Sequence, residues 1–503
     1  MEQILILLPL LIPFVTALLC LLFRKREALQ HVITICGSLA LLIAAVLIIQ
    51  QVETHEFLCE QVSGWKSPFG ITLTIDMLSA LMLGITALIG LLVNLYGIES
   101  IDSKRKKFGY FCFYHFLLMG VNGAFIAGDI FNLYVWFEVM LISSFVLLVL
   151  GNEKLQLVGG VKYMILNFIG SSFLLTGVGM IYGLAGSLNM ADVALFFKSG
   201  DYDPLATVAA TIFMFSFALK AAMFPIFFWL PASYPFTPIA TTAIFSGLLT
   251  KVGVYALLRF FSLIFIGDVG FTHTILLAGA GLTMFTGVLA ALAQNKIKNI
   301  LSFHIISQIG YIVMGPALFT PLAIAGSIFY IIHHILVKTN LFLISGVIEK
   351  IKGSDDLDNI GGLYRKYPIF SGLFLISAFS LAGLPPLSGF WAKFVLIKAG
   401  FEIQEYVIVA VAIVTGILTL FSMSKIWNNA FWKTDPKDSK SKRDPAEGTL
   451  FKTQWKMLLP IVLMALCTLV IGLYSWPLMK YATIAAEQLM SPQDYIGHIL
   501  NTR

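Results

Sequence analysis

The chain has 503 residues, of which 58% are hydrophobic and only 12% are charged, and its formal net charge is +6. A soluble protein of this size carries roughly a quarter charged residues, so this composition excludes a water-facing surface and indicates lipid as the solvent. No long polar segment interrupts the apolar runs, which excludes a separate soluble catalytic domain, and for a membrane chain the basic charge predicts no nucleic-acid partner. The five cysteines lack CxxC spacing, so we expect no iron–sulfur cluster, no other cofactor and no metal site.

Apolar runs long enough to cross a bilayer follow one another almost from end to end. Because a membrane helix needs ~20 mostly apolar residues, these runs predict an all-α polytopic membrane protein with about 14 transmembrane helices. The predicted spans, numbered 1 to 14 in chain order, are 3–23, 31–52, 71–98, 108–127, 129–150, 158–185, 204–230, 237–264, 272–293, 298–319, 321–349, 369–398, 405–431 and 454–480.

The basic residues are distributed unevenly between the two sets of loops. If Arg24 is cytoplasmic, the loops on its side hold 22 Lys and Arg, whereas the opposite loops and both tails hold five. Cytoplasmic loops are enriched in Lys and Arg. The sequence therefore predicts that both termini lie outside and that the basic loop 432–453 is cytoplasmic.

Glu138 in predicted span 5 is the one plainly mid-membrane carboxylate, with no other acid within eight residues on either side. Its natural partner is Lys220 in predicted span 7. A buried Glu–Lys pair can store a charge separation that moves a proton when the pair opens. The alternative is a static buried ion pair, since such a pair alone is weak evidence of function.

Six basic residues fall inside predicted spans: Lys220, Lys251, Arg259, Lys338, Lys393 and Lys425. Arg259 and Lys425 lie toward the ends of their spans, where we expect them to snorkel. The other four look deep, and a lysine at mid-bilayer costs ~2.5–3.5 kcal/mol on insertion scales. Four such lysines indicate a proton relay, because a buried amine can alternate between its charged and neutral forms.

Prolines interrupt two of the spans that carry these lysines. Pro225 follows Lys220 by five residues, and Pro385-Pro386 precede Lys393 by seven. Paired interrupted helices are typical of transporters built from inverted repeats. We therefore predict two inverted five-helix repeats, with spans 7 and 12 interrupted. The expected divisions are 1–107 for spans 1–3, 108–264 for the first repeat, 272–431 for the second, 432–453 for the basic loop, and 454–503 for span 14 with its tail.

Histidine gains and loses a proton near neutral pH, so histidines could link lysine sites that are too far apart for direct proton transfer. His334 and Lys338 in predicted span 11 are four residues apart and share a helix face, whereas His333 points about 100° away. His304 in predicted span 10 corresponds to Glu138 in the repeat pairing. The alternative for either His304 or His334 is a core residue that only forms hydrogen bonds.

Five segments together carry a resemblance to a known family: LKAAMFPIFFWLPASYPFTP, KVGVYALLR, KIKNILSFHIISQIGYIVMG, HHILVKTNLFLISG and LAGLPPLSGFWAKF. They resemble the antiporter-like membrane subunits shared by Mrp-type multi-subunit cation/proton antiporters and respiratory complex I, over about residues 70–430. Within that family the chain looks most like the D-type Mrp subunits. His304 departs from the respiratory members, which more often have a small polar residue there.

The resemblance implies a hydrated central axis that relays protons through Glu138, Lys220, Lys251, His334, Lys338 and Lys393. His304 is a further candidate relay residue from the spacing of the two repeats alone. The resemblance also implies a bacterial cell (inner) membrane, a hetero-oligomeric complex with other Mrp-type subunits, and protons and Na⁺ as the transported ions. Since the chain offers few intramembrane carboxylates, we expect its own path to carry protons and Na⁺ to move elsewhere in the complex.

Three functions remain open from the sequence. The first is a subunit of a Na⁺/H⁺ antiporter, a transporter rather than an enzyme. The second is a proton-pumping subunit of a respiratory NADH:quinone oxidoreductase or a related redox complex. The third is a membrane enzyme whose haem is held by His304, His333 or His334, although haem ligation requires a free imidazole that faces a cavity and no cytochrome pattern is present.

Overall fold

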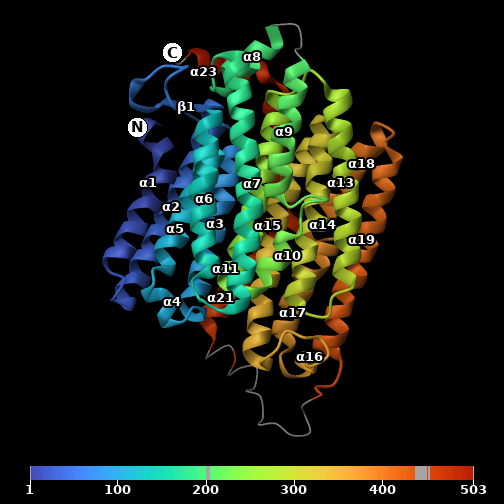
Figure 1. Ribbon diagram of the computed structural model, residues 1–503. Coiled ribbons are helices and arrows are strands. Elements are labelled where there is room, and N and C mark those ends of the chain that lie inside the picture. The colour runs from blue at the N-terminus through green and yellow to red at the C-terminus, as the bar shows by residue number, and fades with distance from the viewer. Residues whose placement is uncertain (1, 200–203, 437–449, 451–453, 502–503) are drawn as a thin grey trace.

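The computed structural model describes residues 2–199, 204–436, 450 and 454–501 and shows a bundle of long helices that run side by side (Figure 1). In these residues twelve helices are long and apolar enough to cross a membrane, and two shorter helices, α5 and α17, are also apolar. These fourteen segments coincide with the fourteen predicted spans. The all-α membrane class is therefore confirmed, and the predicted number of crossings is compatible with the structure.

The helices of the first half and their companions have the following bounds: α1 (Glu2–Leu22), α2 (Glu27–His55), α3 (Met77–Ser100), α4 (Ser103–Lys107), α5 (Tyr110–Ile126), α6 (Ile130–Val149), α7 (Lys154–Ala185), α8 (Met190–Ser199), α9 (Pro204–Ala221), α10 (Trp229–Ser233), α11 (Ile239–Ile244) and α12 (Thr250–Leu263). Those of the second half are α13 (Val269–Leu292), α14 (Ile297–Leu318), α15 (Pro321–Lys352), α16 (Leu363–Lys366), α17 (Pro368–Ala382), α18 (Ser388–Glu402), α19 (Tyr406–Ile426), α21 (Trp455–Leu473), α22 (Trp476–Met490) and α23 (Pro492–Asn501).

The start of predicted span 3 is a strand rather than a helix. Residues Thr72–Ile75 form β2, which pairs antiparallel with β1 (Leu58–Gln61). The ITLTI sequence is rich in β-branched residues, which favour strands. Asp76 then begins α3 as its N-cap, because its carboxylate accepts a hydrogen bond from the backbone N–H of Ser79.

Both predicted interruptions are confirmed. In span 7, α9 ends at Ala221 and α10 begins at Trp229, with Pro225 between them. Proline cannot supply the N–H that a continuous helix needs. In span 12, α17 ends at Ala382 and α18 begins at Ser388, with the prolines again in the gap.

Predicted span 14 is wrong as one continuous helix. It breaks after Leu473, and α22 continues from Trp476 with Pro477 in its first turn, where proline is tolerated. The indole N–H of Trp391 donates to the carbonyl of Gly472 at 2.9 Å, which satisfies one acceptor freed by the break. The expected tail beyond it is helical, as α22 and α23.

A π-helical segment, η3 (Phe245–Leu249), joins α11 to α12, and a second one, η4 (Trp427–Trp432), extends α19. Such widened turns are rare in proteins, and those that occur are often found at functional sites. Neither segment is marked in the sequence by a proline or by a run of charges.

Three spans lie inside the bundle. The apolar stretches of α15 and of the α11–α12 span are wholly buried, and the apolar stretch of α14 is nearly so. In contrast, α2, α7 and α13 expose much of their surface. Figure 1 shows both chain ends at one end of the bundle and α4 and α16 at the other. Lys251, His304, His334 and Lys338 therefore belong to its central helices, away from lipid.

Candidate functional site

Lys220 lies in the last turn of α9, directly before the interruption. Its side chain is buried, and its amine donates to the hydroxyl of Ser171 on α7 at 3.0 Å. The same amine lies 4.7 Å from the ring centroid of Phe137 on α6, a cation–π contact. The helix break thus follows directly after a lysine whose direct contacts, a hydroxyl and an aromatic ring, carry no charge.

Glu138 follows Phe137 on α6 and is half-buried. Among the described residues no ion pair joins it to Lys220, and its Oε1 atom is buried without a hydrogen-bond partner. The two side chains therefore form no ion pair at contact distance in this conformation, although the Glu138 carboxylate still acts on Lys220 through its charge. The direct contacts of the amine are the Ser171 hydroxyl and the Phe137 ring.

Lys251 lies at the start of α12 and is fully buried. Its amine donates to the backbone carbonyl of Ser246, which belongs to the π-helical segment η3. A π turn shifts the hydrogen-bond register of the helix. The widened turn therefore places a backbone acceptor within reach of this lysine, again without an acid.

His334 and Lys338 lie one turn apart on α15, and both are fully buried. Within the described part of the chain, the two ring nitrogens of His334 and the amine of Lys338 all lack a hydrogen-bond partner. A buried polar group left unpaired costs about 1–3 kcal/mol, and more if it is charged. Such groups at the centre of the bundle call for water or for another mobile partner.

Two further histidines contact serines on neighbouring helices. The Nε2 atom of His304 on α14 lies 2.8 Å from the hydroxyl of Ser422 on α19, and its Nδ1 atom is unpaired. The Nδ1 atom of His333 lies 2.8 Å from the hydroxyl of Ser388, which itself contacts Ser380 at 2.9 Å. His333 thus connects α15 to the interruption between α17 and α18. The adjacent His-His pair was its only sequence signal, and helical periodicity alone directed attention away from it.

Lys393 lies on α18, after the interruption of span 12. Its amine donates to the carbonyls of Leu381 and Ala382, the last two of α17, at 3.0 and 2.9 Å. It also lies 4.8 Å from the ring centroid of Tyr311. A cation at a helix C-terminus is favoured by the helix dipole. Lys393 itself thus satisfies two of the carbonyls that the interruption frees.

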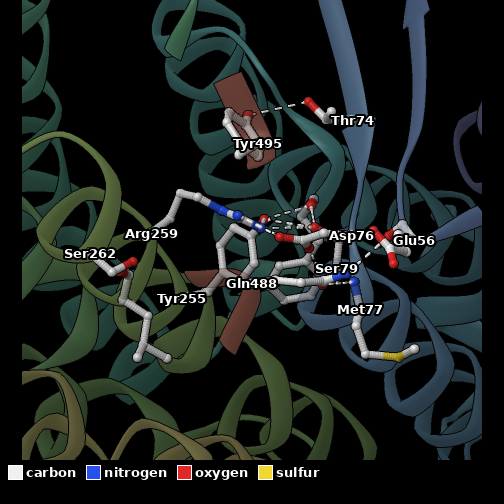
Figure 2. Close-up of polar contacts among 12 residues, drawn as sticks. Glu56, Thr74, Asp76, Met77, Ser79, Tyr255, Arg259, Ser262, Gln488 and Tyr495 are labelled. Carbon is white, nitrogen blue, oxygen red and sulfur yellow. Dashed lines mark hydrogen bonds and ion pairs between the residues drawn. The ribbon is translucent and has the colours of Figure 1, made fainter. Parts of the chain in front are cut away.

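The sequence predicted that Arg259 snorkels toward the membrane surface, and this prediction is wrong. Arg259 lies buried in an ion pair with Asp76. Its Nη1 and Nη2 atoms are 2.6 and 2.9 Å from the two carboxylate oxygens. Figure 2 shows the surrounding group, in which the guanidinium also reaches Ser79 and Tyr255. The ring centroid of Tyr495 on α23 lies 5.5 Å from the guanidinium carbon. We call these five residues the Asp76–Arg259 cluster.

Lys425, the other residue expected to snorkel, is half-buried near the end of α19. Its amine donates to the carbonyls of Leu292 and Gln294, at 3.0 and 2.7 Å, and so caps the C-terminus of α13.

The structure thus brings the predicted residues to the central helices and to the two interruptions that flank them. Partners that sequence reasoning missed are hydroxyls and backbone carbonyls: Ser171, Ser246, Ser388, Ser422, Leu381 and Ala382. Among the described residues, no group of three or more His, Cys, Asp or Glu side chains gathers as metal ligands would.

The sequence of the chain matches a known protein family. Residues 127–419 match the family described as NADH:quinone oxidoreductase/Mrp antiporter, TM. The chain is 45% identical over 496 residues to the D-type subunit of the Na(+)/H(+) antiporter of Alkalihalophilus pseudofirmus, covering 99% of each chain.

Two solved structures share the whole fold. A chain of the Mrp complex from Dietzia sp. DQ12-45-1b matches with a TM-score of 0.91 and 32% identity, over 99% of both chains. A chain of the membrane-bound sulfane sulfur reductase, an archaeal respiratory membrane complex, matches with a TM-score of 0.91 and 27% identity, over 99% of this chain and 100% of that one. The chain therefore belongs to the antiporter-like membrane subunits of the NADH:quinone oxidoreductase/Mrp family, and within it to the group of D-type Mrp subunits.

Proposed function

We propose that this chain is the proton-translocating subunit of a multi-subunit Na⁺/H⁺ antiporter, a transporter and not an enzyme. The observation that carries the proposal is that His334 and Lys338 have no hydrogen-bond partner among the described residues, at the centre of the buried stretch 323–348 of α15. Polar groups at such depth are expensive and are functional by default. The name of the relative from Alkalihalophilus pseudofirmus and the Mrp complex neighbour support the assignment to an antiporter assembly.

The partners of the lysines support a relay rather than a set of static ion pairs. Lys220 binds a hydroxyl, whereas Lys251 and Lys393 bind backbone carbonyls. Neutral acceptors allow an amine to exist in both its charged and neutral forms, whereas a carboxylate at contact distance would favour the charged form alone. The proposed relay therefore runs from Glu138 and Lys220, through Lys251 and the α15 pair, to Lys393.

The second half of the relay involves the histidines. His304 and His333 each keep one unpaired ring nitrogen. We propose that His334, with His304 as an additional step, passes protons from Lys338 toward Lys393. In this proposal residues 108–264 and 272–431 are inverted repeats, flanked by spans 1–3 and by span 14, and each contributes one half of the path.

We further propose that both termini face outward from a bacterial inner membrane and that loop 432–453 is cytoplasmic. The 22-to-5 distribution of basic residues supports this orientation. Few carboxylates line the axis, so Na⁺ passes through other subunits of the complex.

The test is ion exchange in inverted membrane vesicles that contain the complete complex and no other Na⁺/H⁺ antiporter. We expect added Na⁺ to dissipate an imposed pH gradient, without any electron donor. The resemblance to a respiratory complex chain favours a second candidate, a proton-pumping subunit of a redox complex. Proton pumping that needs NADH or another donor, with no response to Na⁺ and with co-purifying redox subunits, would establish that candidate instead.

A further inference from the structure

A small cavity of about 250 Å³ lies between α2, α3 and α21, at the end of the bundle that carries α4. His31 precedes Ile35 by about one turn near the start of α2, and Trp455 precedes Leu459 by about one turn at the start of α21. The lining is therefore polar or aromatic toward the end of the bundle and aliphatic deeper inside it. Such a cavity offers the two kinds of surface that an amphipathic ligand needs.

Lys456 lines the cavity and is held only loosely by the protein. Its amine lies 3.6 Å from a carboxylate oxygen of Glu99, beyond hydrogen-bond distance, and the two side chains are 48% and 37% exposed. Exposed ion pairs of this kind contribute little to stability. Lys456 can therefore exchange Glu99 for another anionic partner at little cost.

His31 contributes a buried nitrogen that lacks a partner. The side chain is half-buried, and its Nε2 atom has no hydrogen bond to any described residue. The ring packs edge-on against that of Phe111, with 5.8 Å between the centroids. Nearly all buried polar atoms in folded proteins are hydrogen-bonded. A protonated Nε2 can donate to an anionic oxygen, and such a bond is stronger than one to a neutral acceptor.

The surroundings of the cavity are positively charged. The segments that contribute its outer lining, 24–31, 98–107 and 455–459, hold eight Lys and Arg and three Asp and Glu. A surplus of Lys and Arg is general at the cytoplasmic end of membrane proteins. A general surplus, however, needs neither a cavity nor a buried nitrogen without a partner.

Lys106 brings a further positive charge close to this cavity. It is only 6% exposed, and its amine donates at 2.7 Å to the carbonyl of Ile98, which lines the cavity. Both Lys106 and Lys456 lie near enough to His31 to act on it through their charges. Glu27 acts on His31 in the opposite sense, but it also accepts a hydrogen bond from the Ser103 hydroxyl at 3.2 Å.

We propose that this cavity binds one anionic phospholipid and holds its phosphate between His31 and Lys456. The first part of an acyl chain packs along Ile35 and Leu459. Basic pockets between transmembrane helices on the cytoplasmic side are typical sites for acidic lipid headgroups. Trp455 is 55% exposed at the first residue of α21, and Trp residues are enriched at the depth of the headgroups. The bound lipid connects α2 to α21, and none of its contacts belongs to the lysine axis.

The test compares two photoactivatable lipids with identical acyl chains, the anionic phosphatidylglycerol and the zwitterionic phosphatidylcholine. Each is incorporated into vesicles that contain the complete complex, and mass spectrometry of peptides locates the adducts after illumination. We expect phosphatidylglycerol to label segments 31–35 and 455–459 at least about five-fold more than phosphatidylcholine does, since each basic residue near an anionic headgroup is worth about that factor in affinity.

Lys456→Gln should lower the labelling by phosphatidylglycerol to about the level of phosphatidylcholine. Lys480→Gln on α22 is the matched control, because the Lys480 amine lies 3.5 Å from Glu53 and its side chain is 51% exposed. This variant should be labelled like the unaltered complex. His31→Leu, which removes the ring nitrogens, should also lower the labelling and provides a second test if Lys456→Gln does not assemble.

Equal labelling of these segments by the two lipids would overturn the site, because it would show only ordinary contact with the bilayer. Labelling of Lys456→Gln that equals the labelling of Lys480→Gln would overturn it as well. Neither measurement uses antiport, so both outcomes are independent of the proposed relay.

Discussion

Helix α12 carries two buried basic residues eight positions apart, and they illustrate opposite solutions to the same problem. Arg259 is held by both carboxylate oxygens of Asp76. Lys251 donates to a backbone carbonyl in η3 and lies near His334 and Lys338 on α15, whose side-chain nitrogens have no hydrogen-bond partner among the described residues. Burial alone therefore does not reveal the role of a basic residue. The chemistry of its partner separates a fixed charge from one that can be exchanged.

The Asp76–Arg259 cluster connects several helices through buried polar contacts. Asp76 also caps α3, and Tyr495 brings the C-terminal helix α23 over the guanidinium (Figure 2). Gln488 on α22 adds to it, because its amide oxygen accepts a hydrogen bond from the backbone N–H of Met77 at 3.0 Å. The cluster thus connects α3, α12 and the C-terminal helices at one end of the bundle.

The largest expected effect is on stability, in Asp76→Asn. Removing one partner of a buried pair costs about 3–5 kcal/mol, because the remaining charge is uncompensated. Thermal unfolding of the purified complex should reveal this loss. Asp102→Asn is the matched control, since Asp102 also caps a helix and contacts Arg105 but is exposed, and such pairs contribute about 0–1 kcal/mol. Equal stability of the two variants would show that the buried Asp76–Arg259 pair contributes no more to stability than the exposed Asp102–Arg105 pair.

At Lys393 the comparison is tested through function. Arg keeps the charge and can reach the same carbonyls, but it is effectively never deprotonated. We therefore expect Lys393→Arg and Lys393→Ala each to lower antiport by at least about ten-fold. Lys425→Arg is the control, because Lys425 also donates to the last carbonyls of a helix and is assigned no relay role. Full antiport with Arg and none with Ala would show that Lys393 acts only through its charge.

Glu138→Gln tests whether the first half of the path needs a carboxylate that does not touch its lysine. The side chain keeps its size, so the protein should assemble normally. We expect antiport to fall at least several-fold, because an amide cannot accept and release a proton. Ser171→Ala, which removes the hydroxyl that binds Lys220, should have a smaller effect, since water can replace that hydroxyl. Near-normal antiport in Glu138→Gln would assign the residue a structural role.

The smallest effect is expected at Asp129, in the loop between α5 and α6. Burial raises the pKa of this carboxyl to about 6, although its hydrogen bond to the backbone N–H of Asn132 opposes the shift. The native state therefore binds the proton more tightly than the unfolded chain, and stability falls as pH rises from about 4 to 6. Asp129→Asn keeps the helix cap and should stabilise the complex by roughly 1–2 kcal/mol at pH 8.

Thermal unfolding of the Asp129→Asn and unaltered complexes at pH 5 and pH 8 measures this difference. The gain should shrink at pH 5, where Asp129 is largely protonated. A gain of the same size at both pH values would show that the charge of Asp129 is not its source.

The sequence predicts those features of the fold that depend on local composition. Apolar runs locate the helices, Pro225 and Pro385-Pro386 locate two interruptions, and charges inside apolar runs identify the lysines. Features set by the approach of distant segments escape it. The Asp76 partner of Arg259 is 183 residues away, and the Ser171 partner of Lys220 is 49 residues away.

Other misses arise from backbone geometry. The break after Leu473 has a proline only on its far side, within the first turn of α22, and the π turn of η3 follows an ordinary apolar sequence. For the Glu138–Lys220 pair, the sequence identified the two charges but not the hydroxyl and the aromatic ring that directly contact the amine. The proposed relay therefore depends on distances that no spacing rule could supply.

The most direct test of the central claim is Lys338→Met, measured for antiport and for thermal stability in the same preparation, beside Arg259→Met. Replacing an unpaired buried amine with an apolar side chain of similar length should leave stability unchanged or higher, since no partner is left behind. We expect Lys338→Met to assemble fully and to lose antiport, and Arg259→Met to lose stability because it leaves the Asp76 carboxylate buried without a counter-charge. Retained antiport in Lys338→Met, or a stability loss equal to that of Arg259→Met, would contradict this expectation.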